Sequence, residues 1–346
     1  MTKKSKHSVT IRDVAKKAGV SVATVSRYLN SNAPVSVATS KRLKKVMKDM
    51  LYVPHAAARH LASKKTRVIG LLVNNLHNDF FVPLLNGVEA VIQGRDYNFM
   101  IATYREGSRH LPPPVGPHNT DGMLLFSDGL SDEALVALNT RNYPIVLVHR
   151  TPPEFTKIPS VTVENKKITI ELMEHFIKKH GKKRIIFMRG PANQEDSYWR
   201  ELGYRHVLKA NNIPFDEKLI LNGGFDRDVA YESMNKFLSS ENRVEFDAIF
   251  TGSDDAAIGV LKALQQYSIR VPEQVSVAGF DDLGFARFLN PPLTTVRAPT
   301  EAVGRIATER LFNLLEDRIE EGVVLLPTEI VIRRSCGCQF ESSLDE

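Results

Sequence analysis

The chain has 346 residues, of which 42% are hydrophobic, and its formal net charge is +6. This length exceeds one average domain and allows a small domain beside a larger two-lobed body. No apolar run approaches the roughly 18 residues of a membrane-spanning helix. A secretory signal has an apolar segment after its basic N-terminal residues, and this sequence has no such segment there. We therefore expect a cytoplasmic protein with no membrane partner.

Charge is distributed unevenly along the chain. Residues 1–65 contain 15 lysines and arginines but only two acidic residues, Asp13 and Asp49, which gives a net charge of +13. Because the whole chain carries +6, residues 66–346 carry −7. A basic region joined to a mildly acidic body is expected when only that region contacts nucleic-acid phosphates. A solvated charged face would mix the two signs more evenly.

The basic region begins with the pattern of a short capped helix. Thr10 is suited to the N-cap position, and apolar residues follow Ile11 at i+3, i+4 and i+7, on one helical face. Gly19 ends this helix at the position where a left-handed backbone costs least. The sequence therefore predicts a helix that ends at a glycine turn.

A second short helix follows at once. Ser21 is suited to cap it, and Val25 and Leu29 point inward, whereas four side chains point outward: Val22, Ala23, Ser26 and Arg27. Two helices joined by a glycine-containing turn form a helix-turn-helix, whose second helix can enter the major groove of DNA. A helical hairpin without DNA contacts is the alternative. The positive charge of the region favours DNA binding.

Two more helical segments are expected before residue 66. Residues 36–50 place Leu43 and other apolar residues on one face and complete a three-helix core. Pro54 opens a short alanine-rich segment, and proline suits a first helical turn. About nine helical residues are too few for stability in isolation, so this segment would fold only against a partner. Leu61 is either an ordinary packing residue or a wedge for a minor-groove base step.

From Arg67 the pattern changes to strands that alternate with helices. Short apolar runs such as residues 68–73 and 145–149 are typical of buried parallel strands. Helical patterns, among them residues 81–93 and 168–180, lie between such runs. This alternation predicts doubly wound α/β domains with ligands at the carboxyl ends of the strands. Roughly ten strands are too many for one ordinary sheet, so we expect two lobes.

The connection at residues 105–121 breaks this alternation. It contains a triple proline at 112–114 and a fourth proline at 117. Consecutive prolines cannot continue a helix, so we expect an irregular or polyproline-like connection. A plain loop is the favoured interpretation, and a partner-binding segment is the alternative.

The only cysteines, Cys336 and Cys338, stand one residue apart near the C-terminus. Such a pair makes a poor structural clamp, and two residues alone are too few ligands for a zinc site. We interpret them as free thiols in a reducing compartment, and we expect neither a metal nor another cofactor.

Four stretches together resemble the LacI/GalR (lactose/galactose repressor) family of transcription regulators. They are DVAKKAGVSVATVSRYLN, the YVP…LA segment, the RxxGY pattern at 200–204, and SVAGFDD…PPLTTV. The resemblance implies an α-helical head, a hinge helix, and a periplasmic-binding-protein-like body. The two lobes of that body, each built on a doubly wound parallel sheet, would clamp a small effector. It also implies homodimers, some paired into tetramers, that bind pseudo-palindromic operator DNA.

The resemblance also implies the division of this chain. The parts are the DNA-binding head at 1–53, the hinge helix and linker at 54–65, the first lobe at 66–165 and 297–327, and the second lobe with its tail at 166–296 and 328–346.

On the head, Val22, Ala23 and Arg27 match base-reading positions of the family. Arg27 alone can make a bidentate contact to guanine, which contributes on the order of 1–3 kcal/mol of discrimination. Leu61 matches the intercalating hinge leucine. The positions that match phosphate contacts, which orient the protein without reading sequence, are Thr10, Ser21, Thr24, Ser26 and Asn30.

On the body, Arg200 matches the arginine that grips effector hydroxyls or carboxylates. Phe225 lies where an aromatic ring commonly stacks on a sugar, and Asp254 and Asp281 match acidic pocket positions. The first-lobe wall of the pocket would consist of Asn74, Phe80, His149 and Arg150. The implied effector is a sugar, a sugar acid or a phosphosugar. For each residue an ordinary structural role is the alternative, and for Asp254 this is capping of the following helix.

Two departures from the family pattern accompany these matches. The proline segment replaces what is usually a full helix, and Leu51 stands where Gly or Asn often ends the third helix. A left-handed backbone at this leucine would cost roughly 1–2 kcal/mol.

We therefore predict a transcriptional repressor whose operator affinity is switched by the effector, and not an enzyme. A solute-binding transport protein is disfavoured by the basic head and the missing signal. An enzyme on a Rossmann-like fold is disfavoured because no GxGxxG or P-loop lysine motif is present.

Overall fold

A computed structural model describes residues 9–30, 34–52, 65–104, 113–126 and 129–339. The chain forms two compact units, residues 1–67 and residues 68–346. The expected hinge helix with Leu61 lies outside the described residues. None of the helices in the described part of the chain is long and apolar enough to cross a membrane.

The N-terminal unit contains three helices: α1 (Ile11–Ala18), α2 (Val22–Asn30) and α3 (Val37–Asp49). Thr10 caps α1 as predicted, because the Asp13 amide donates to Thr10 Oγ1 while the Thr10 amide donates to Asp13 Oδ2 at 2.9 Å. Gly19 adopts the predicted left-handed backbone, with φ of 61°. The helices enclose a small core of fully or nearly fully buried side chains: Val14, Ala15, Ala18, Val25 and Leu43.

Leu51 follows α3 in a left-handed conformation. Its φ is 49° and its side chain is 86% exposed. A β-carbon in this backbone region crowds the neighbouring carbonyl, which costs roughly 1–2 kcal/mol. The chain therefore turns after α3 at a position where glycine or asparagine would be less strained.

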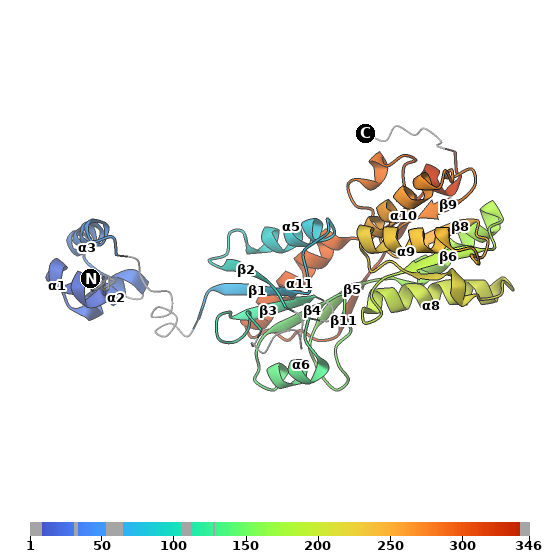
Figure 1. Ribbon diagram of the computed structural model, residues 1–346. Helices are drawn as coiled ribbons and strands as arrows, with labels where there is room; N and C mark the ends of the chain where they lie inside the picture. The colour runs from blue at the N-terminus through green and yellow to red at the C-terminus, as the bar shows by residue number, and fades with distance from the viewer. Residues whose placement is uncertain (1–8, 31–33, 53–64, 105–112, 127–128, 340–346) are drawn as a thin grey trace, which may run out of the picture. The chain divides into compact units, whose positions relative to one another are not determined.

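The first sheet of the larger unit has six parallel strands in the order β11-β5-β4-β3-β1-β2. Helices α5 and α11 cover one face of this sheet and α6 covers the other (Figure 1). The elements are β1 (Val68–Val73), α5 (Phe81–Ile92), β2 (Asn98–Thr103), β3 (Gly122–Phe126), α6 (Asp132–Asn139), β4 (Ile145–Val148), β5 (Ser160–Val163), α11 (Thr300–Leu315) and β11 (Val323–Leu326).

Helices α5 and α11 touch through glycines. A β-carbon on Gly87 would lie 2.0 Å from the Glu301 carbonyl oxygen, and one on Gly304 would lie 2.2 Å from the Leu84 carbonyl oxygen. Only glycine permits such a close backbone approach. The contact fixes the position of α5, and the first residue of this helix, Phe81, lines a cavity of the larger unit.

The connection from β2 to β3 contains no helix in its described part, residues 113–121. This agrees with the expected irregular connection. Val115 anchors this connection, because its side chain is only 1% exposed and packs against Gly70. A β-carbon on Gly70 would lie 2.1 Å from Val115 Cγ1. The proline-rich segment therefore ends in a packed residue of the first lobe.

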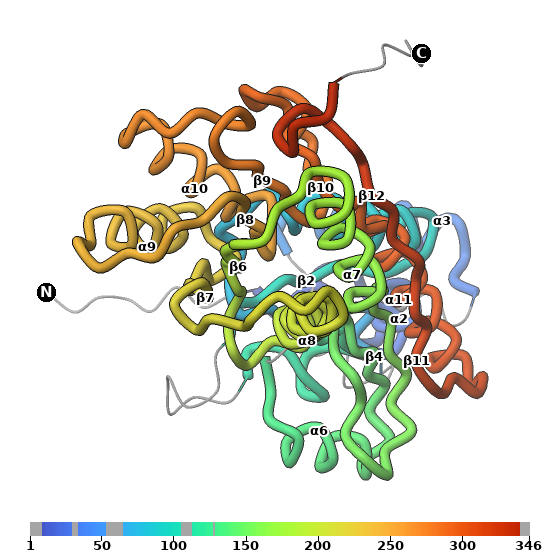
Figure 2. The backbone as a smooth tube through the Cα atoms, turned by 90° about the vertical axis from the view of Figure 1, so that its right-hand side faces the viewer, coloured from blue at the N-terminus to red at the C-terminus, as the bar shows by residue number. Residues whose placement is uncertain are grey.

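The second sheet has four parallel strands in the order β7-β6-β8-β9 (Figure 2). Helix α7 ends in a π-helical turn, η1, so the single helix predicted at 168–180 is two elements. The elements are α7 (Lys166–Glu174), η1 (His175–Lys179), β6 (Ile185–Arg189), α8 (Glu195–Ala210), η2 (Glu217–Leu219), β7 (Ile220–Asn222), α9 (Arg227–Ser239), β8 (Ala248–Thr251), α10 (Asp254–Gln266), β9 (Ser276–Ala278), η3 (Ala286–Phe288) and η4 (Arg334–Cys336).

Three chain segments link the two sheets. They run from β5 to α7, from β10 (Thr295–Arg297) to α11, and from β11 to β12 (Glu329–Val331). Strands β10 and β12 pair antiparallel between the sheets. The predicted architecture of a helical head and a two-lobed α/β body with parallel sheets is confirmed.

Candidate DNA interface and effector site

The second helix of the N-terminal unit exposes the side chains expected to read bases. Val22, Ala23 and Arg27 are exposed, whereas Val25 is fully buried and holds the helix in the core. Two apolar side chains and one guanidinium therefore form the outer face of α2. Arg27 has the planar set of donors that matches the O6 and N7 acceptors of guanine.

The hydroxyls expected to contact phosphate serve first as local caps. Ser21 Oγ accepts from the Thr24 amide at 3.1 Å and lies 2.9 Å from Thr24 Oγ1, and Thr10 Oγ1 donates to Asp13 Oδ2 at 2.6 Å. Ser26 is half-buried. Asn30 is the last residue of α2, and its side chain lies outside the described part of the chain. Exposed cations on α3 add positive charge: Lys41, Arg42, Lys44, Lys45 and Lys48.

A cavity lies between the two sheets of the larger unit, at the carboxyl ends of their strands. The first sheet contributes residues that follow β1 and end β3, and the second contributes residues that follow β6, β7, β8 and β9. The cavity encloses about 80 Å³. Its lining is Asn74, Asn75, Asn78, Phe80, Phe81, Phe126, Pro191, Gln194, Asp196, Arg200, Gly224, Phe225, Ser253, Asp255, Asp281 and Leu283.

Arg200 on α8 is the central cation of this cavity and is only 3% exposed. Its Nε donates to Asn165 Oδ1 at 2.9 Å, and its Nη1 donates to the Gly252 carbonyl oxygen. The guanidinium carbon lies 3.5 Å from the centre of the Phe280 ring and 5.2 Å from that of Phe225. Burial lowers the pKa of Arg200, and nearby carboxylates oppose this effect. The guanidinium thus lies against the Phe280 ring, with the Phe225 ring also within cation–π distance.

Phe225 is held in place by two glycines. A β-carbon on Gly190 would lie 2.2 Å from Phe225 Cζ, and one on Gly252 would lie 2.8 Å from Phe225 Cε1. Phe225 itself has a left-handed backbone, with φ of 56°. The ring therefore fills a space that two missing side chains leave open, next to Arg200. An aromatic face in this position is suited to stack on a sugar ring.

Several hydrogen bonds and ion pairs join the two lobes around the cavity. His149 Nδ1 donates to Asp196 Oδ2 at 2.7 Å, and the Thr151 amide donates to Glu195 Oε1 at 2.9 Å. On the other side, Asp79 and Arg227 form an ion pair at 3.5 Å, and Asn78 Nδ2 donates to the Phe225 carbonyl oxygen at 3.3 Å. The relative position of the lobes therefore depends on residues that line or border the cavity.

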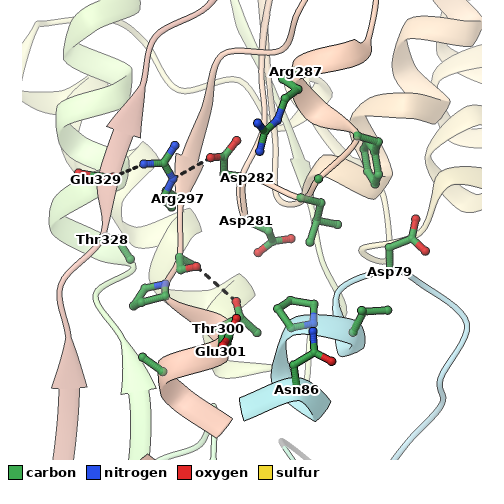
Figure 3. A pocket seen from close by; sticks show the side chains of 18 of the residues that line it. Asp79, Asn86, Asp281, Asp282, Arg287, Arg297, Thr300, Glu301, Thr328 and Glu329 are labelled. Atoms are coloured by element: carbon green, nitrogen blue, oxygen red, sulfur yellow. Dashed lines mark hydrogen bonds and ion pairs between the residues drawn. The ribbon is translucent and has the colours of Figure 1, made fainter. Parts of the chain in front are cut away.

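Asp281 lies between this cavity and a wider pocket of about 1170 Å³. Figure 3 shows Asp281 among the side chains that line this pocket, with Arg297 joined to Asp282 and Glu329. Burial raises the pKa of Asp281 well above its ordinary value, although the Arg200 charge acts in the opposite direction. Its carboxyl group can therefore meet a ligand from either side.

Comparison with known proteins places the chain in a family. Residues 10–55 match the family described as bacterial regulatory proteins, lacI family, and residues 173–336 match a periplasmic binding protein-like domain. The HTH-type transcriptional regulator RegA of Clostridium saccharobutylicum is 32% identical over 334 residues, which cover 95% of this chain and 99% of RegA. The chain belongs to the LacI family.

Two solved structures are similar over nearly the whole LacI-family chain. A transcriptional regulator CelR–cellobiose complex is 28% identical with a TM-score of 0.67, covering 94% of this chain and 99% of that one. The Lac repressor dimer bound to operator and an anti-inducer, ONPF, has the same fold, with 23% identity, a TM-score of 0.76 and coverage of 95% and 99%. This LacI-family chain is a DNA-binding transcriptional regulator, as its sequence predicts.

In this LacI-family body, five of the eight effector residues suggested by sequence line the one cavity: Asn74, Phe80, Arg200, Phe225 and Asp281. His149 does not line this cavity, and its ring lies edge-on to Phe80 and tilted against Phe126, with the ring centres 5.5 Å apart in both pairs. Arg150 lies in a separate pocket, where it is ion-paired with Asp132.

Asp254 departs from the expectation that it faces the effector. Its Oδ1 accepts from Thr295 Oγ1 at 2.6 Å and its Oδ2 accepts from the Leu283 amide at 2.8 Å. The side chain is fully buried and holds the loop after β9, while Ser253 caps α10. The neighbouring Asp255 lines the cavity instead and accepts from Arg227 Nε at 2.9 Å.

The lining also includes Asp196, which was not among the effector residues predicted from the sequence. Asp196 precedes Arg200 by one helical turn, so the i, i+4 spacing on α8 was the signal that could have revealed it. The cavity residues contain no cluster of cysteines and histidines within the described chain. The lining therefore offers hydrogen-bonding groups and aromatic faces rather than metal ligands.

Proposed function

We propose that this LacI-family regulator is a repressor whose affinity for operator DNA is switched by a neutral sugar bound in the cavity at Arg200. The observation that carries this proposal is the lining of the cavity. The buried Arg200 guanidinium lies against the Phe280 ring and near the Phe225 ring, and the side chains of Asp196, Asp255 and Asp281 also line the cavity. Such a combination of ring faces and charged acceptors is suited to a hydroxyl-rich ring.

The charges favour a neutral sugar over a sugar acid or a phosphosugar. Two of the guanidinium nitrogens of Arg200 already donate within the protein, and its Nη2 lies 3.9 Å from Asp196 Oδ2. Few donors are left for an anionic group, which would also meet the Asp196 carboxylate at close range. Hydroxyl groups, by contrast, can donate to this carboxylate.

The size of the cavity links ligand binding to movement of the lobes. About 80 Å³ is well below the roughly 300–1,000 Å³ of pockets that hold drug-sized ligands. A sugar would therefore enter only if the lobes separate or rotate, which alters the His149–Asp196 and Asp79–Arg227 contacts. A ligand changes the balance of two states only through different affinities for them, typically 1–3 kcal/mol in allosteric proteins.

The output of this switch would be the helix-turn-helix unit. We propose a homodimer whose two α2 helices contact two half-sites of an operator, with Arg27 reading a guanine and Leu61 of each subunit wedged into a central base step. Lobe movement would change the spacing of the two hinge segments. Part of the specificity would then come from a deformable operator centre.

A thermal-shift panel tests the ligand class. Full-length protein is heated with glucose, cellobiose, ribose, glucuronate or glucose 6-phosphate, because a ligand that binds only the folded state raises the melting temperature. We expect a neutral sugar to raise the melting temperature of the wild-type protein. This increase should be lost in Arg200→Ala and kept in Arg205→Ala, which serves as a control on the same helix. Stabilisation by glucuronate or glucose 6-phosphate alone, or an unaltered response in Arg200→Ala, would contradict the proposal.

A further inference from the structure

Two segments that lie far apart in the sequence bring four potential metal ligands together in the second lobe. Cys338 Sγ lies 3.5 Å from His175 Nε2, a residue 163 positions earlier, and 3.4 Å from His180 Nε2. The two Nε2 atoms lie 3.2 Å apart. All ligand atoms of the group lie within 4.8 Å of one another, and we name it the His2Cys2 cluster: His175, His180, Cys336 and Cys338.

The π-helical turn at the end of α7 explains why the two histidines meet. In an α-helix, side chains three or four residues apart are neighbours, and side chains five apart point to different sides. The i to i+5 hydrogen bonding of η1 adds one residue to the turn, so His180 takes the place of an i+4 neighbour of His175. Such single π turns are frequent at functional sites.

A glycine turn explains why the two cysteines meet the histidines. Gly337 has φ of 101°, a conformation that residues with a side chain rarely adopt. It follows the short helix η4 and directs the chain back, so that the flanking cysteines lie beside the same two rings. Ser276 Oγ donates to the Cys336 carbonyl oxygen at 2.8 Å and fixes this turn on the second lobe.

The spacing of three of these ligand atoms is that of a tetrahedral zinc site. With zinc–nitrogen bonds of ~2.0–2.1 Å and zinc–sulfur bonds of ~2.3 Å, two ligand nitrogens lie about 3.3 Å apart and a nitrogen and a sulfur about 3.6 Å apart. The observed separations among His175 Nε2, His180 Nε2 and Cys338 Sγ, which are 3.2, 3.4 and 3.5 Å, agree with these values. Cys336 Sγ lies within 4.8 Å of these atoms and donates to the Arg333 carbonyl oxygen at 3.3 Å, so it would exchange this hydrogen bond for the ion. We propose that the His2Cys2 cluster binds one Zn²⁺ ion per chain.

The chemistry of the donors selects the ion. Thiolates and imidazoles favour zinc and copper over magnesium or calcium, and zinc adopts the tetrahedral S2N2 arrangement. The neutral imidazole is the form of histidine that binds a metal ion. Lysines near the histidines oppose a cation, and the two thiolates would balance the two charges of Zn²⁺.

In the sequence, the two cysteines alone are too few ligands for a zinc site. The fold supplies the other two from the end of α7, and the histidines and Cys338 are partly exposed, which leaves a route for the ion. The bound ion would fasten the segment after β12 to α7. We expect it to stabilise the second lobe without contacting the cavity at Arg200.

Cobalt substitution tests the site directly. Reduced, metal-free, full-length protein is titrated with Co²⁺, whose tetrahedral thiolate complexes absorb strongly in the visible and near-ultraviolet. We expect one Co²⁺ per chain with a thiolate-to-cobalt band, and one equivalent of Zn²⁺ should abolish the spectrum. Cys338→Ser and His180→Ala should lose this band, whereas His206→Ala, which removes an exposed histidine on α8, should keep it.

Two measurements on the unaltered chain do not depend on the folding of variants. Zn²⁺ should raise the melting temperature of the reduced protein and slow alkylation of Cys338. The proposal fails if Zn²⁺ changes neither quantity, or if the Co²⁺ spectrum lacks a thiolate band or persists in Cys338→Ser.

Discussion

His149 Nδ1 lies 2.7 Å from Asp196 Oδ2, and this hydrogen bond joins the first lobe to the second. Asp196 also accepts from Asn165 Nδ2 at 2.8 Å and lies 3.9 Å from Arg200 Nη2. The Nε2 atom of His149 is buried and has no hydrogen-bond partner among the described residues. The Asp196 carboxylate therefore joins the two lobes through His149, lines the cavity and lies close to Arg200.

Replacement of Asp196 by Asn should destabilise the larger unit and make its stability less dependent on acid pH. Burial alone would raise the pKa of Asp196, but His149, Arg200 and Asn165 outweigh burial and hold it below the ordinary value of 3.8. A depressed folded-state pKa contributes stability that is present above 3.8 and is lost as the pH falls through the folded value.

Chemical denaturation at several pH values measures this effect. At pH 7 we expect Asp196→Asn to lose roughly 1–3 kcal/mol, because the amide presents a donor to groups that already donate. The difference between variant and wild type should shrink as the pH is lowered below 3.8. A difference that is constant with pH would show that the carboxylate charge is not responsible.

Gly190→Ala should weaken sugar binding by displacing the Phe225 ring. The added β-carbon would lie 2.2 Å from Phe225 Cζ, so the ring must leave its present position beside Arg200. Loss of the stacking surface should lower sugar affinity about two- to tenfold, since a ring contact contributes roughly 0.5–1.5 kcal/mol. Isothermal titration calorimetry measures this, and Gly116→Ala, whose β-carbon has 3.5 Å of clearance, serves as the control.

Arg27→Ala should lower the preference for operator over unrelated DNA. The guanidinium is exposed on α2 and can bond guanine in the major groove, so its loss should cost on the order of 1–3 kcal/mol at one base pair. Lys45→Ala on α3 removes an exposed charge and should leave the ratio of specific to non-specific affinity unchanged. Fluorescence anisotropy at fixed salt measures both affinities. Equal effects of the two substitutions on this ratio would refute base reading by Arg27.

Leu51→Asn should stabilise the N-terminal unit. Asparagine tolerates the left-handed backbone at φ of 49° better than leucine, and the leucine side chain is 86% exposed and has little packing to lose. We expect a gain of about 1 kcal/mol, seen as slower amide exchange in α3 of the full-length chain. Val37→Asn, at an exposed right-handed position of the same helix, should give no gain.

The parts of the fold that local patterns specify were predictable from sequence. Thr10 and Gly19 act at the caps where their chemistry suggests, because a cap depends on residues within one helical turn. The role of Arg200 in the cavity was also predictable, because this residue is the first of the RxxGY pattern at 200–204. The π turn at His175 was not predictable, since tertiary packing determines whether a helix accommodates an extra residue.

The site was predictable only in part, because several positions depend on helix rotation and long-range packing. Asp254 and Asp255 are adjacent in sequence, yet one holds the loop at Leu283 and the other lines the cavity. Adjacent residues on a helix point in different directions, and packing of α10 decides which one faces the cavity. The proximity of Cys338 to His175 likewise follows from the return of the chain after β12 and from no local pattern.

The most direct test of the account is the operator affinity of the full-length protein with and without the sugar that the thermal-shift panel identifies. We predict a sugar-dependent change of about 5- to 150-fold in the wild-type dissociation constant, corresponding to a coupling of 1–3 kcal/mol. In Arg200→Ala the operator affinity without sugar should be retained and the response to sugar lost. An unchanged operator affinity in wild type at saturating sugar would contradict the account.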